Sequence, residues 1–443
     1  MRRLLFLILA AIGPQAAFAL DAPPNIIFVL TDDLGPGDLG CYGGELVATP
    51  NIDRLAKEGT KFDQYYVASP VCSPSRCGLI TGQFPARWRI TSYLAQKSRN
   101  AGGEMANFLD PEAPSLPRAL KDAGYRTAHI GKWHLGGGRD VTDAPKFSAY
   151  GYDEHVGTYE SPEPDPEITS TDWIWSRKDH VKRWRRTEYF VDKTLDFLRR
   201  NQDKPCFVNL WLDDVHTPWI PNVAAQKEKQ PNVMKNLKPV IAETDRQIGR
   251  LMAGLGELGL GNRTLVIFTS DNGPYPHLEG RTGNLRGCKF SLYEGGVRLP
   301  FIARWPGVVP AGVTDKDTVL ASVDMFPTLC HVAGAKNTNS ACDGLDRFTA
   351  LTGTPTSTRE RPLMWEYGRN AKFFGYPKGP GDRSPNLAMR DGKWKLLVQA
   401  DGQGAELYDL SSDPGETTNV AKEYPDEAAR MQTAVLDWRR SLP

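Results

Sequence analysis

A short stretch near residue 72 combines residue types suited to binding and attacking an anion. In the run Val71-Cys72-Ser73-Pro74-Ser75-Arg76, a proline follows the cysteine by two residues and an arginine by four. Pro74 suits the first turn of a helix, so Cys72 is expected at a helix N-terminus, the end that favours anions. Arg76 lies one turn later on the same face. The stretch predicts a site for a tetrahedral oxyanion; a Cys72–Cys77 disulfide or a buried thiol is the structural alternative.

Polar side chains follow four apolar runs that have the length and composition of buried strands. The runs are 25–30, 125–131, 207–212 and 264–269, and their β-branched, continuously apolar character favours a parallel sheet. They are followed in turn by Asp32-Asp33, Lys132 with His134, His216, and Asp271-Asn272. Sites in open α/β sheets are built at the carboxyl ends of the strands, so these groups are expected to meet there. Lys132 and His134, two apart in an extended segment, are expected to point to the same side.

The acidic members of this group suit a divalent cation. Three carboxylates and one amide oxygen, from Asp32, Asp33, Asp271 and Asn272, favour calcium or magnesium over zinc. Adjacent buried carboxylates are also costly unless a cation holds them. Because such a site needs no imidazole, the two histidines stay free for proton transfer. Taken alone, each group has an ordinary explanation, such as Asp32 capping the next element.

The pattern of the chain divides it into three parts. Residues 1–19 have two arginines, the apolar run 4–12 and a small-residue cleavage site at 17–19, which predicts a secretory signal too short to span a membrane. Residues 20–355 carry the strands above alternating with helices, for example at 50–56, 116–123 and 240–258. Short strands at 364–367, 387–389, 394–398 and 406–410, then a helix at 427–438, follow in residues 356–443. We therefore expect a large, mostly parallel α/β domain and a smaller antiparallel sheet with one helix.

Composition limits the classes of function. The formal charge of +1, which falls to −1 when the two signal arginines are removed, argues against a nucleic-acid binder. No later stretch is a candidate membrane span, so we expect a soluble protein that is periplasmic or secreted. Seven cysteines leave one without a partner, and Cys72 is the candidate. Among the other six, Cys330 and Cys342 form the easiest pair.

Two further regions admit a role in substrate binding. The basic residues 182–186 form either a solvated helix face or a basic rim that faces the substrate. Four loop residues are candidates for lining a sugar subsite: Trp219, His277, Arg281 and Arg286.

The Cys72–Arg76 stretch, followed by Thr81-Gly82, resembles the active-site signature of the sulfatases, Cys-x-Pro-x-Arg followed by Thr-Gly. Further blocks resemble that family in their usual order, and together they cover nearly the whole mature chain: Asn25–Asp33, Gly131–Gly136, His216–Pro218, Thr269–Gly273 and Lys289 with Glu294–Gly296. The resemblance implies an arylsulfatase-type enzyme with the alkaline-phosphatase-like α/β fold and a smaller C-terminal sheet domain.

The resemblance also implies roles for the site residues. In this family the cysteine is oxidised to formylglycine (3-oxoalanine), which implies a maturation enzyme as a partner of this chain and residue 72 as the nucleophile. It implies calcium, with magnesium less favoured, held by Asp32, Asp33, Asp271 and Asn272 and faced by residue 72. Arg76, Lys132 and Lys289 would hold the nucleophile and the sulfate oxygens, and His134 would serve the formylglycine hydroxyl. His216 or Lys289 would protonate the leaving alcohol, so that Lys132, His216 and Lys289 bind substrate. A further polar residue follows Gly157 in many members; Ser161 is a weak candidate and stays unassigned.

The substrate implied is a sulfate ester, and the many aromatic residues in loops favour a sulfated carbohydrate. Two other functions stay open. One is a phosphoester or phosphonate hydrolase of the same superfamily. The other is an inactive protein that binds sulfated glycans and whose Cys72 is never oxidised. The sugar, the position of its sulfate, exo or endo action and the oligomeric state are not determined by the sequence.

Overall fold

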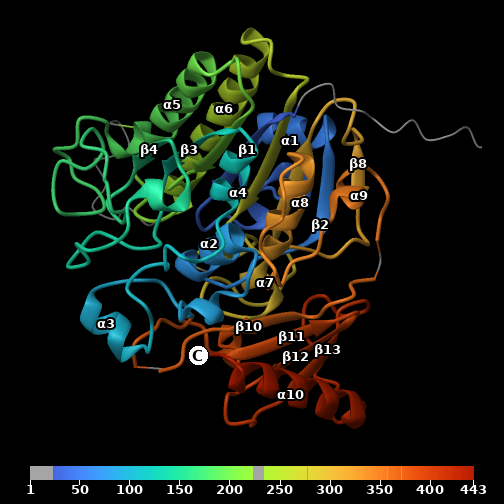
Figure 1. Ribbon diagram of the computed structural model, residues 1–443. Helices are drawn as coiled ribbons and strands as arrows, with labels where there is room; N and C mark the ends of the chain where they lie inside the picture. Colours follow the sequence, from blue (N-terminus) through green and yellow to red (C-terminus); the bar gives the residue numbers. More distant parts are fainter. Residues whose placement is uncertain (1–22, 223–233, 277, 357, 371) are drawn as a thin grey trace, which may run out of the picture.

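The computed structural model describes residues 23–222, 234–276, 278–356, 358–370 and 372–443 (Figure 1). Two sheets organise this part of the chain. The predicted secretory signal at residues 1–19 and the subsite candidate His277 lie outside the described residues. Within the described residues, no helix has the length and apolar character needed to cross a membrane.

The larger sheet carries the residues that the sequence places in a site. Its strand order is β4-β3-β5-β1-β6-β7-β2-β8, with β9 paired to β2. All neighbours are parallel except β7, which runs antiparallel to β6 and β2. The predicted large, mostly parallel sheet is thus confirmed. Its strands are β1 (Asn25–Thr31), β2 (Thr60–Tyr66), β3 (Arg126–Gly131), β4 (Glu154–Gly157), β5 (Cys206–Trp211), β6 (Thr264–Ser270), β7 (Arg298–Arg304), β8 (Val313–Asp315) and β9 (Leu320–Ala321).

Strand β1 lies at the centre of this sheet because its side chains are apolar on both faces. It pairs with β5 on one side and β6 on the other, and all seven of its residues are buried. Ile26, Phe28 and Leu30 join one hydrophobic core, whereas Ile27 and Val29 join another. This alternation places a core on each face of the sheet.

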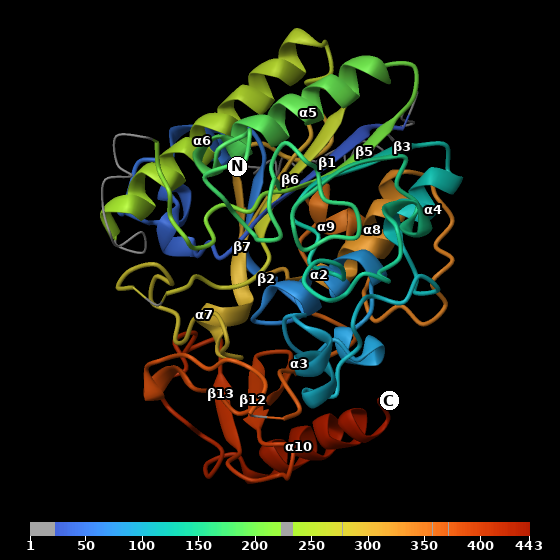
Figure 2. The same ribbon diagram turned by 90° about the vertical axis from the view of Figure 1, so that its left-hand side faces the viewer.

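Helices cover both faces (Figures 1 and 2). The first core is packed by α2 and α8, and the second by α1, α5 and α6. Helix α6 begins earlier than expected, at Met234, and continues through Pro239. The helices of this domain are α1 (Pro50–Lys57), α2 (Cys72–Thr81), α3 (Lys97–Gly102), α4 (Leu116–Asp122), α5 (Arg186–Arg200), α6 (Met234–Glu257), α7 (Glu294–Val297), α8 (Met325–Val332) and α9 (Phe348–Leu351).

The C-terminal part forms the predicted small antiparallel sheet with one covering helix. The strand order is β10-β11-β12-β13, and the strands are joined in antiparallel pairs. Helix α10 packs on β11 and β12, on the side of this sheet away from the larger domain (Figure 1). The elements are β10 (Leu363–Glu366), β11 (Leu387–Asp391), β12 (Trp394–Val398), β13 (Glu406–Asp409) and α10 (Pro425–Arg440).

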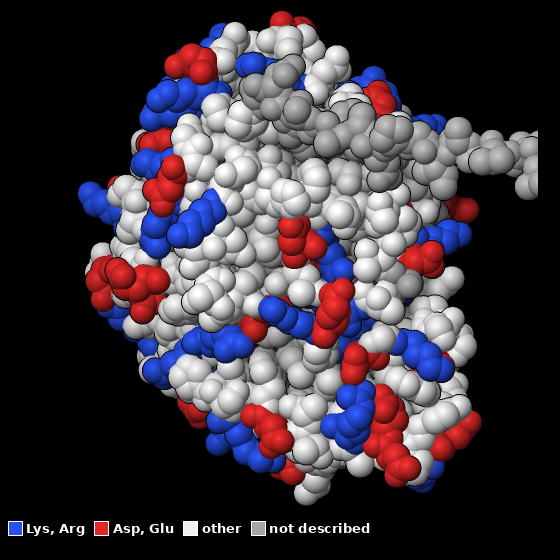
Figure 3. Space-filling model, turned by 45° about the vertical axis from the view of Figure 1, so that its right-hand side comes forward, with Lys and Arg blue, Asp and Glu red and all other residues white. Residues whose placement is uncertain are grey.

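The seven cysteines are all free thiols, so the expected Cys330–Cys342 pair is wrong. The Sγ of Cys342 instead faces the carbonyl oxygen of Gly82 at 3.3 Å. The alternative of a Cys72–Cys77 disulfide fails as well, which leaves Cys72 available for other chemistry. On the face shown in Figure 3, basic and acidic side chains are interspersed, in keeping with the near-neutral charge of the chain.

Candidate active site

The carboxyl ends of four parallel strands bring the predicted charged groups together. Asp32 follows β1, Lys132 follows β3, and Asp271 follows β6. The Lys132 Nζ donates to Asp32 Oδ2 at 2.5 Å, and the backbone N–H of Asp33 faces Asp271 Oδ1 at 3.4 Å. Asp32, Asp33 and Asp271 are completely buried. The ends of β1 and β6, which are more than 200 residues apart in sequence, therefore meet at one edge of the sheet, as expected.

Cys72 is the first residue of α2 and lies among these groups. Its Sγ is 3.4 Å from Lys132 Nζ, 3.5 Å from Lys289 Nζ and 3.6 Å from Asp32 Oδ1. Burial, and then the neighbouring carboxylate of Asp32, raise the pKa of the Cys72 thiol well above its ordinary value. Residue 72 therefore sits where two ammonium groups from distant parts of the chain converge.

Arg76 is completely buried and directs its guanidinium at carboxylates rather than at Cys72. Its Nε and Nη2 donate to Asp271 Oδ2 at 3.0 and 2.7 Å, and Nη1 donates to the carbonyl oxygen of Lys132 at 2.6 Å. A weaker contact of 3.4 Å reaches Asp32. Such a fork of donors fixes orientation strongly. Arg76 therefore ties the ends of β3 and β6 to α2.

Lys289, from the loop before α7, is the third basic residue of the site after Arg76 and Lys132. Its Nζ donates to Asp33 Oδ1 at 2.6 Å, and its backbone N–H donates to the carbonyl oxygen of Pro274. Burial opposes the charge of Lys289, but the nearby Asp33 carboxylate raises its pKa well above the ordinary value. It is thus a fixed, charged group beside residue 72.

Two buried oxygens in this cluster are suited to binding a cation. Asp33 Oδ2 and Asn272 Oδ1 have no hydrogen-bond partner, although buried acceptors are almost always satisfied. Burial and the Asp32 charge raise the pKa of Asp271 to about 6, even though Arg76 binds its Oδ2 at 2.7 Å, because neighbouring carboxylates crowd this site. Oxygen donors of this kind suit a hard divalent ion.

The residues that offer ligand atoms within 4.8 Å of one another are Asp32, Asp33, Cys72 and His216. His216 was expected to stay outside the metal set. Its Nε2 is 3.7 Å from Asp33 Oδ2, while its Nδ1 faces the carbonyl oxygen of Thr217 at 2.5 Å and must donate there. The imidazole is therefore oriented with Nε2 toward the carboxylates, at the border of the site.

His134 is positioned differently from the expectation. Residues 132–134 are not in a strand, and His134 has a left-handed φ of 54°, so the extended segment predicted here is wrong. Its Nε2 contacts the carbonyl oxygen of Leu94 at 3.0 Å. Burial lowers the pKa of His134 to about 3, which keeps the imidazole neutral.

Comparison with known proteins decides the family. The sulfatase family model matches residues 24–335. The chain belongs to the sulfatase family. A second model, for the C-terminal part of N-sulphoglucosamine sulphohydrolase, matches residues 288–439. The protein is therefore a sulfuric ester hydrolase, as the resemblance of the Cys72 signature predicted.

Relatives and solved structures agree over nearly the full length. Human arylsulfatase A is 33% identical, with 91% of this chain and 85% of the relative covered. The N-acetylgalactosamine-6-sulfatase of Sus scrofa is 34% identical, covering 99% and 90%. The structure of Ps i-CgsB in complex with k-i-k-neocarrahexaose superimposes with a TM-score of 0.77 at 26% identity, covering 94% of this chain and 93% of the other.

The basic run is divided between surface and interior: Arg185 is exposed, whereas Arg183 and Arg186 line the small cavity that also contains Asp32 and His216. Arg183 and Arg186 are buried. Arg183 Nη1 donates to Asp213 Oδ1 at 2.6 Å, and Arg186 Nη1 donates to Asp213 Oδ2 at 2.8 Å. Arg183 also donates to the carbonyl oxygen of His216 at 3.2 Å. These residues hold the loop after β5 in place. Sequence reasoning missed them because charge runs are usually solvated and nothing local names their partner.

The proposed sugar-subsite residues are mostly structural. Trp219 and Arg281 are completely buried: the indole donates to the carbonyl oxygen of Val215, and the guanidinium binds Asp38 at 2.7 Å. Arg286 donates to Tyr408 in the C-terminal sheet. Ser161 is buried too, and its hydroxyl donates to the carbonyl oxygen of Thr158.

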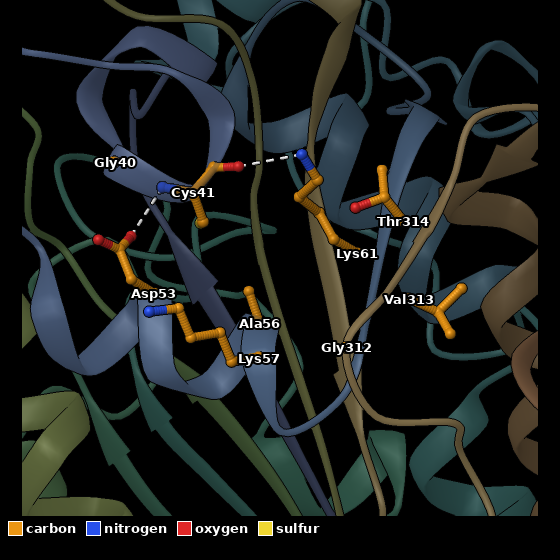
Figure 4. Close-up of a pocket in the computed structure, with 9 residues that line it drawn as sticks. All are labelled: Gly40, Cys41, Asp53, Ala56, Lys57, Lys61, Gly312, Val313 and Thr314. Carbon is orange, nitrogen blue, oxygen red and sulfur yellow. Dashed lines mark hydrogen bonds between the residues drawn. The ribbon is translucent and has the colours of Figure 1, made fainter.

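Two cavities lie on different parts of the sulfatase. A small one of about 30 Å³ borders the site; Asp32, Lys132, Glu160 and His216 are among its lining residues. Figure 4 shows a larger one of about 400 Å³, lined by residues of α1, β2 and β8. There Lys61 donates to the carbonyl oxygen of Cys41, and none of the predicted site residues lines it. The chemistry therefore belongs to the smaller cavity.

Proposed function

We propose that this sulfatase cleaves sulfate esters of carbohydrates, using a formylglycine made from Cys72 as the nucleophile and a calcium ion. The observation that carries the proposal is the convergence of Lys132 Nζ and Lys289 Nζ on Cys72 Sγ, at 3.4 and 3.5 Å. Two ammonium groups fixed by buried carboxylates form a preorganised binding site for a sulfate group.

The hydrated aldehyde of formylglycine explains why an oxidised cysteine is needed. Its first hydroxyl would lose its proton as the oxygen attacks sulfur, and the bond from sulfur to the sugar oxygen would break, its electron pair passing to the sugar oxygen, which takes up a proton. The second hydroxyl then loses its proton, the carbon–oxygen double bond re-forms, and sulfate departs. A serine can do the first step but cannot release sulfate by the second. Lys132 and Lys289 would stabilise the charge on the sulfate oxygens throughout.

The two histidines and Lys289 would share the proton transfers. His134 would serve the hydroxyl of residue 72, and His216 or Lys289 would protonate the leaving alcohol. Because Nδ1 donates to the Thr217 carbonyl oxygen, His216 would give a proton from Nε2 only as the imidazolium; burial lowers the pKa of His216, and the Asp33 carboxylate 3.7 Å away opposes this. Neither assignment has yet been tested, and both stay predictions.

The unpartnered oxygens of Asp33 and Asn272 support a cation site. Asp32, Asp33, Asp271 and Asn272, with residue 72 facing them, would hold calcium, with magnesium as the second choice. The cation would offset the negative charge that the sulfate brings. Arg76, which fixes Asp271, would keep these ligands in register.

Relatives support a carbohydrate substrate. The pig relative is named for N-acetylgalactosamine 6-sulfate, and a relative from Bacteroides thetaiotaomicron, 29% identical, is an N-acetylgalactosamine-6-O-sulfatase. We further propose export through the signal at residues 1–19, conversion of Cys72 by a formylglycine-generating enzyme, and a boundary between the two domains near residue 355.

A phosphonate or phosphoester hydrolase is the rival function. The phosphonate monoester hydrolase of Agrobacterium radiobacter shares the fold with a TM-score of 0.65 at 21% identity. The fold alone therefore does not separate sulfate from phosphorus esters. Turnover of a panel of sulfated oligosaccharides, beside matched phosphodiesters and phosphonates, separates them directly; preference for the phosphorus esters contradicts the proposal.

The nucleophile is tested by mass spectrometry of the Cys72 peptide from active protein. Formylglycine is expected to make it about 18 Da lighter than the cysteine form. Cys72→Ser should fold normally and stall after at most one turnover, because the sulfated serine has no second hydroxyl. An unmodified Cys72 in protein that is fully active, or sustained turnover by Cys72→Ser, rules out the formylglycine mechanism.

A further inference from the structure

His134 is held by a set of contacts that determine which of its nitrogens carries the proton. A carbonyl oxygen only accepts, so the 3.0 Å contact with Leu94 requires the proton on Nε2. The other nitrogen, Nδ1, is buried and has no hydrogen-bond partner. The ring therefore presents an unprotonated nitrogen, with a free lone pair, inside a nearly closed part of the protein.

Glu160 holds the same histidine from the opposite segment of chain. Its Oε1 lies 3.4 Å from His134 Nε2, and its backbone carbonyl oxygen accepts the N–H of His134 at 2.9 Å. Glu160 is only 6% exposed, and Arg139 Nη2 binds its Oε1 at 2.5 Å. The carboxylate is thus a fixed anion beside the Nε2 proton.

This arrangement is tied to residue 72 through Leu94. The Leu94 carbonyl oxygen binds His134, and the Leu94 N–H donates to the Ser73 hydroxyl at 3.0 Å. Ser73 directly follows the proposed nucleophile. Glu160 and Lys132 also line the same small cavity beside Asp32 and His216. Glu160 therefore lines the cavity at the reacting centre, and the Leu94 backbone joins His134 to the residue that follows the nucleophile.

We propose that Glu160 is the positioning residue of a Glu160–His134 dyad that releases sulfate from the enzyme. The inference rests on the proposed formylglycine mechanism and assigns to that mechanism a residue that makes no contact with substrate. Glu160 fixes the ring and stabilises the positive charge that the ring gains when Nδ1 takes a proton.

In the release of sulfate, the bonds that break and form lie in sulfated residue 72 and in the ring of His134. The remaining hydroxyl gives its proton to His134 Nδ1, and the electron pair of that O–H bond forms the carbon–oxygen double bond. The bond from carbon to the sulfate oxygen breaks, and sulfate leaves with the electron pair of this broken bond. The imidazolium, its Nε2–H facing Glu160, later returns the proton to water, and hydration of the aldehyde restores the starting state.

The pKa of His134 is consistent with a proton-accepting role for His134 and a positioning role for Glu160. Burial lowers the pKa of His134, and the carboxylate of Glu160 opposes that effect more strongly than any other neighbour. The cations nearest the ring, Lys132 and Arg139, lower it further. Removing the charge of Glu160 therefore leaves His134 a weaker base without removing its hydrogen bond to Leu94.

Glu160→Gln is the discriminating variant, and Glu163→Gln is its matched control. Glu163 lies on the same loop, is partly exposed, and binds the backbone N–H of Phe147 instead. In Glu160→Gln we expect release of sulfate to slow about 10- to 100-fold. Both kcat and KM should fall together, kcat/KM should stay near the wild-type value, and sulfated enzyme should accumulate in intact-mass spectra. Glu163→Gln should behave as the wild type.

Two further measurements test the dyad itself. The effect of Glu160→Gln should vanish in a His134→Ala background, because the carboxylate acts through the ring. In protein labelled with 15N-histidine, long-range 1H–15N spectra should show the proton of His134 on Nε2, both in the wild type and in Glu160→Gln. A proton on Nδ1 contradicts the assignment of the base.

The outcomes also separate this inference from the proposed function. If wild-type protein carries formylglycine and cleaves sulfate esters while Glu160→Gln keeps full kcat, the dyad is wrong and the function stands. A raised KM for sugar sulfates with kcat unchanged shows instead that Glu160 contacts substrate, and overturns the positioning role. If the wild type neither carries formylglycine nor cleaves sulfate esters, the function has failed.

Discussion

Two of the clusters of buried charge in this sulfatase differ in what completes them. The first is the catalytic cluster around Asp32, Asp33 and Cys72. The second, which we call the junction cluster, consists of Glu294, Lys395 and Glu416, and it joins the two sheets. Lys395 and Glu294 are completely buried and Glu416 is 1% exposed, so burial does not distinguish the clusters.

The two carboxylates of the junction cluster are both ion-paired with the same lysine. Lys395 Nζ lies 2.8 Å from Glu294 Oε1 and 3.0 Å from Glu416 Oε1. Glu294 Oε2 accepts from the Tyr66 hydroxyl, and Glu416 Oε2 accepts from the backbone N–H of Glu294, each at 2.6 Å. Three of the four carboxylate oxygens therefore accept a hydrogen bond, whereas Glu416 Oε1 has none and is held by the ion pair with Lys395.

The catalytic cluster is not complete in the same way. Asp33 Oδ2 has no hydrogen bond, and His216 is 3.7 Å away from it. Asn272 Oδ1 has no hydrogen bond either. A buried polar group without a partner is unfavourable unless something else binds there. The junction cluster therefore balances its carboxylates with Lys395, whereas in the catalytic cluster two oxygens of hydrogen-bonded neighbours, Asp33 and Asn272, lack a partner.

The largest expected effect separates activity from stability. Cys72→Ala should lower kcat by about a millionfold, as loss of a nucleophile does elsewhere, and change the free energy of unfolding little. Lys395→Met should lower the free energy of unfolding by about 3–5 kcal/mol, because it removes the ammonium group between two buried carboxylates, although Glu294 keeps a 3.5 Å contact with Arg298. Its folded fraction should keep near-normal kcat. Denaturant unfolding and initial rates check both.

Lys393, two residues before Lys395, provides the control for the Lys395→Met variant. Lys393 forms an exposed ion pair with Asp409, with half of its side chain accessible. Lys393→Met should leave the free energy of unfolding close to that of the wild type, because exposed ion pairs contribute little to stability. A Lys395→Met protein as stable as this control shows that the junction cluster contributes nothing, and the comparison then fails.

A cation should stabilise only the catalytic cluster. At a concentration about 100 times its dissociation constant, calcium added to chelator-treated protein should raise the free energy of unfolding by about 2.7 kcal/mol. Asp33→Asn should lose most of this gain. Lys395→Met should keep it, since its defect lies in the other cluster. Equal stabilisation of wild type and Asp33→Asn by calcium contradicts the proposed site.

Much of the catalytic cluster was predictable because it obeys a rule about strand ends. Asp32, Lys132 and Asp271 each follow a strongly apolar run, and parallel strands bring such ends together. The helix that starts at Cys72 was predictable from Pro74 and the apolar residues after it. Both signals are local in sequence, which explains why they could be found without knowing the partners.

What the sequence did not reveal depends on weak strands or on distant partners. Strand β4 (Glu154–Gly157) is too short and polar to be recognised, and Glu160 directly follows it; the strand-end rule applies to Glu160 once β4 is known. The pairing of Arg183 with Asp213 joins residues 30 apart and has no local signature. The same is true of Lys395 and Glu294, which are 101 residues apart.

The smallest expected effect concerns the proton balance of the junction cluster, in which two carboxylates share one lysine. Burial raises the pKa of Glu416 to about 7, although Lys395 opposes this. The unfolded chain loses this proton near pH 4.5, so between about pH 4.5 and 7 the folded state binds more protons than the unfolded one. Stability must therefore fall as the pH rises through this window, and level off above it.

Glu416→Gln should remove this dependence, because the amide resembles the protonated carboxyl. Between pH 5 and 7 the free energy of unfolding of the wild type should fall by on the order of 1 kcal/mol more than that of the variant. Glu423→Gln, at an exposed position, should keep the wild-type slope. If the slopes of Glu416→Gln and wild type coincide, Glu416 keeps its charge at neutral pH. In that case Lys395 balances two carboxylates at once, and the junction cluster is as crowded with charge as the catalytic one.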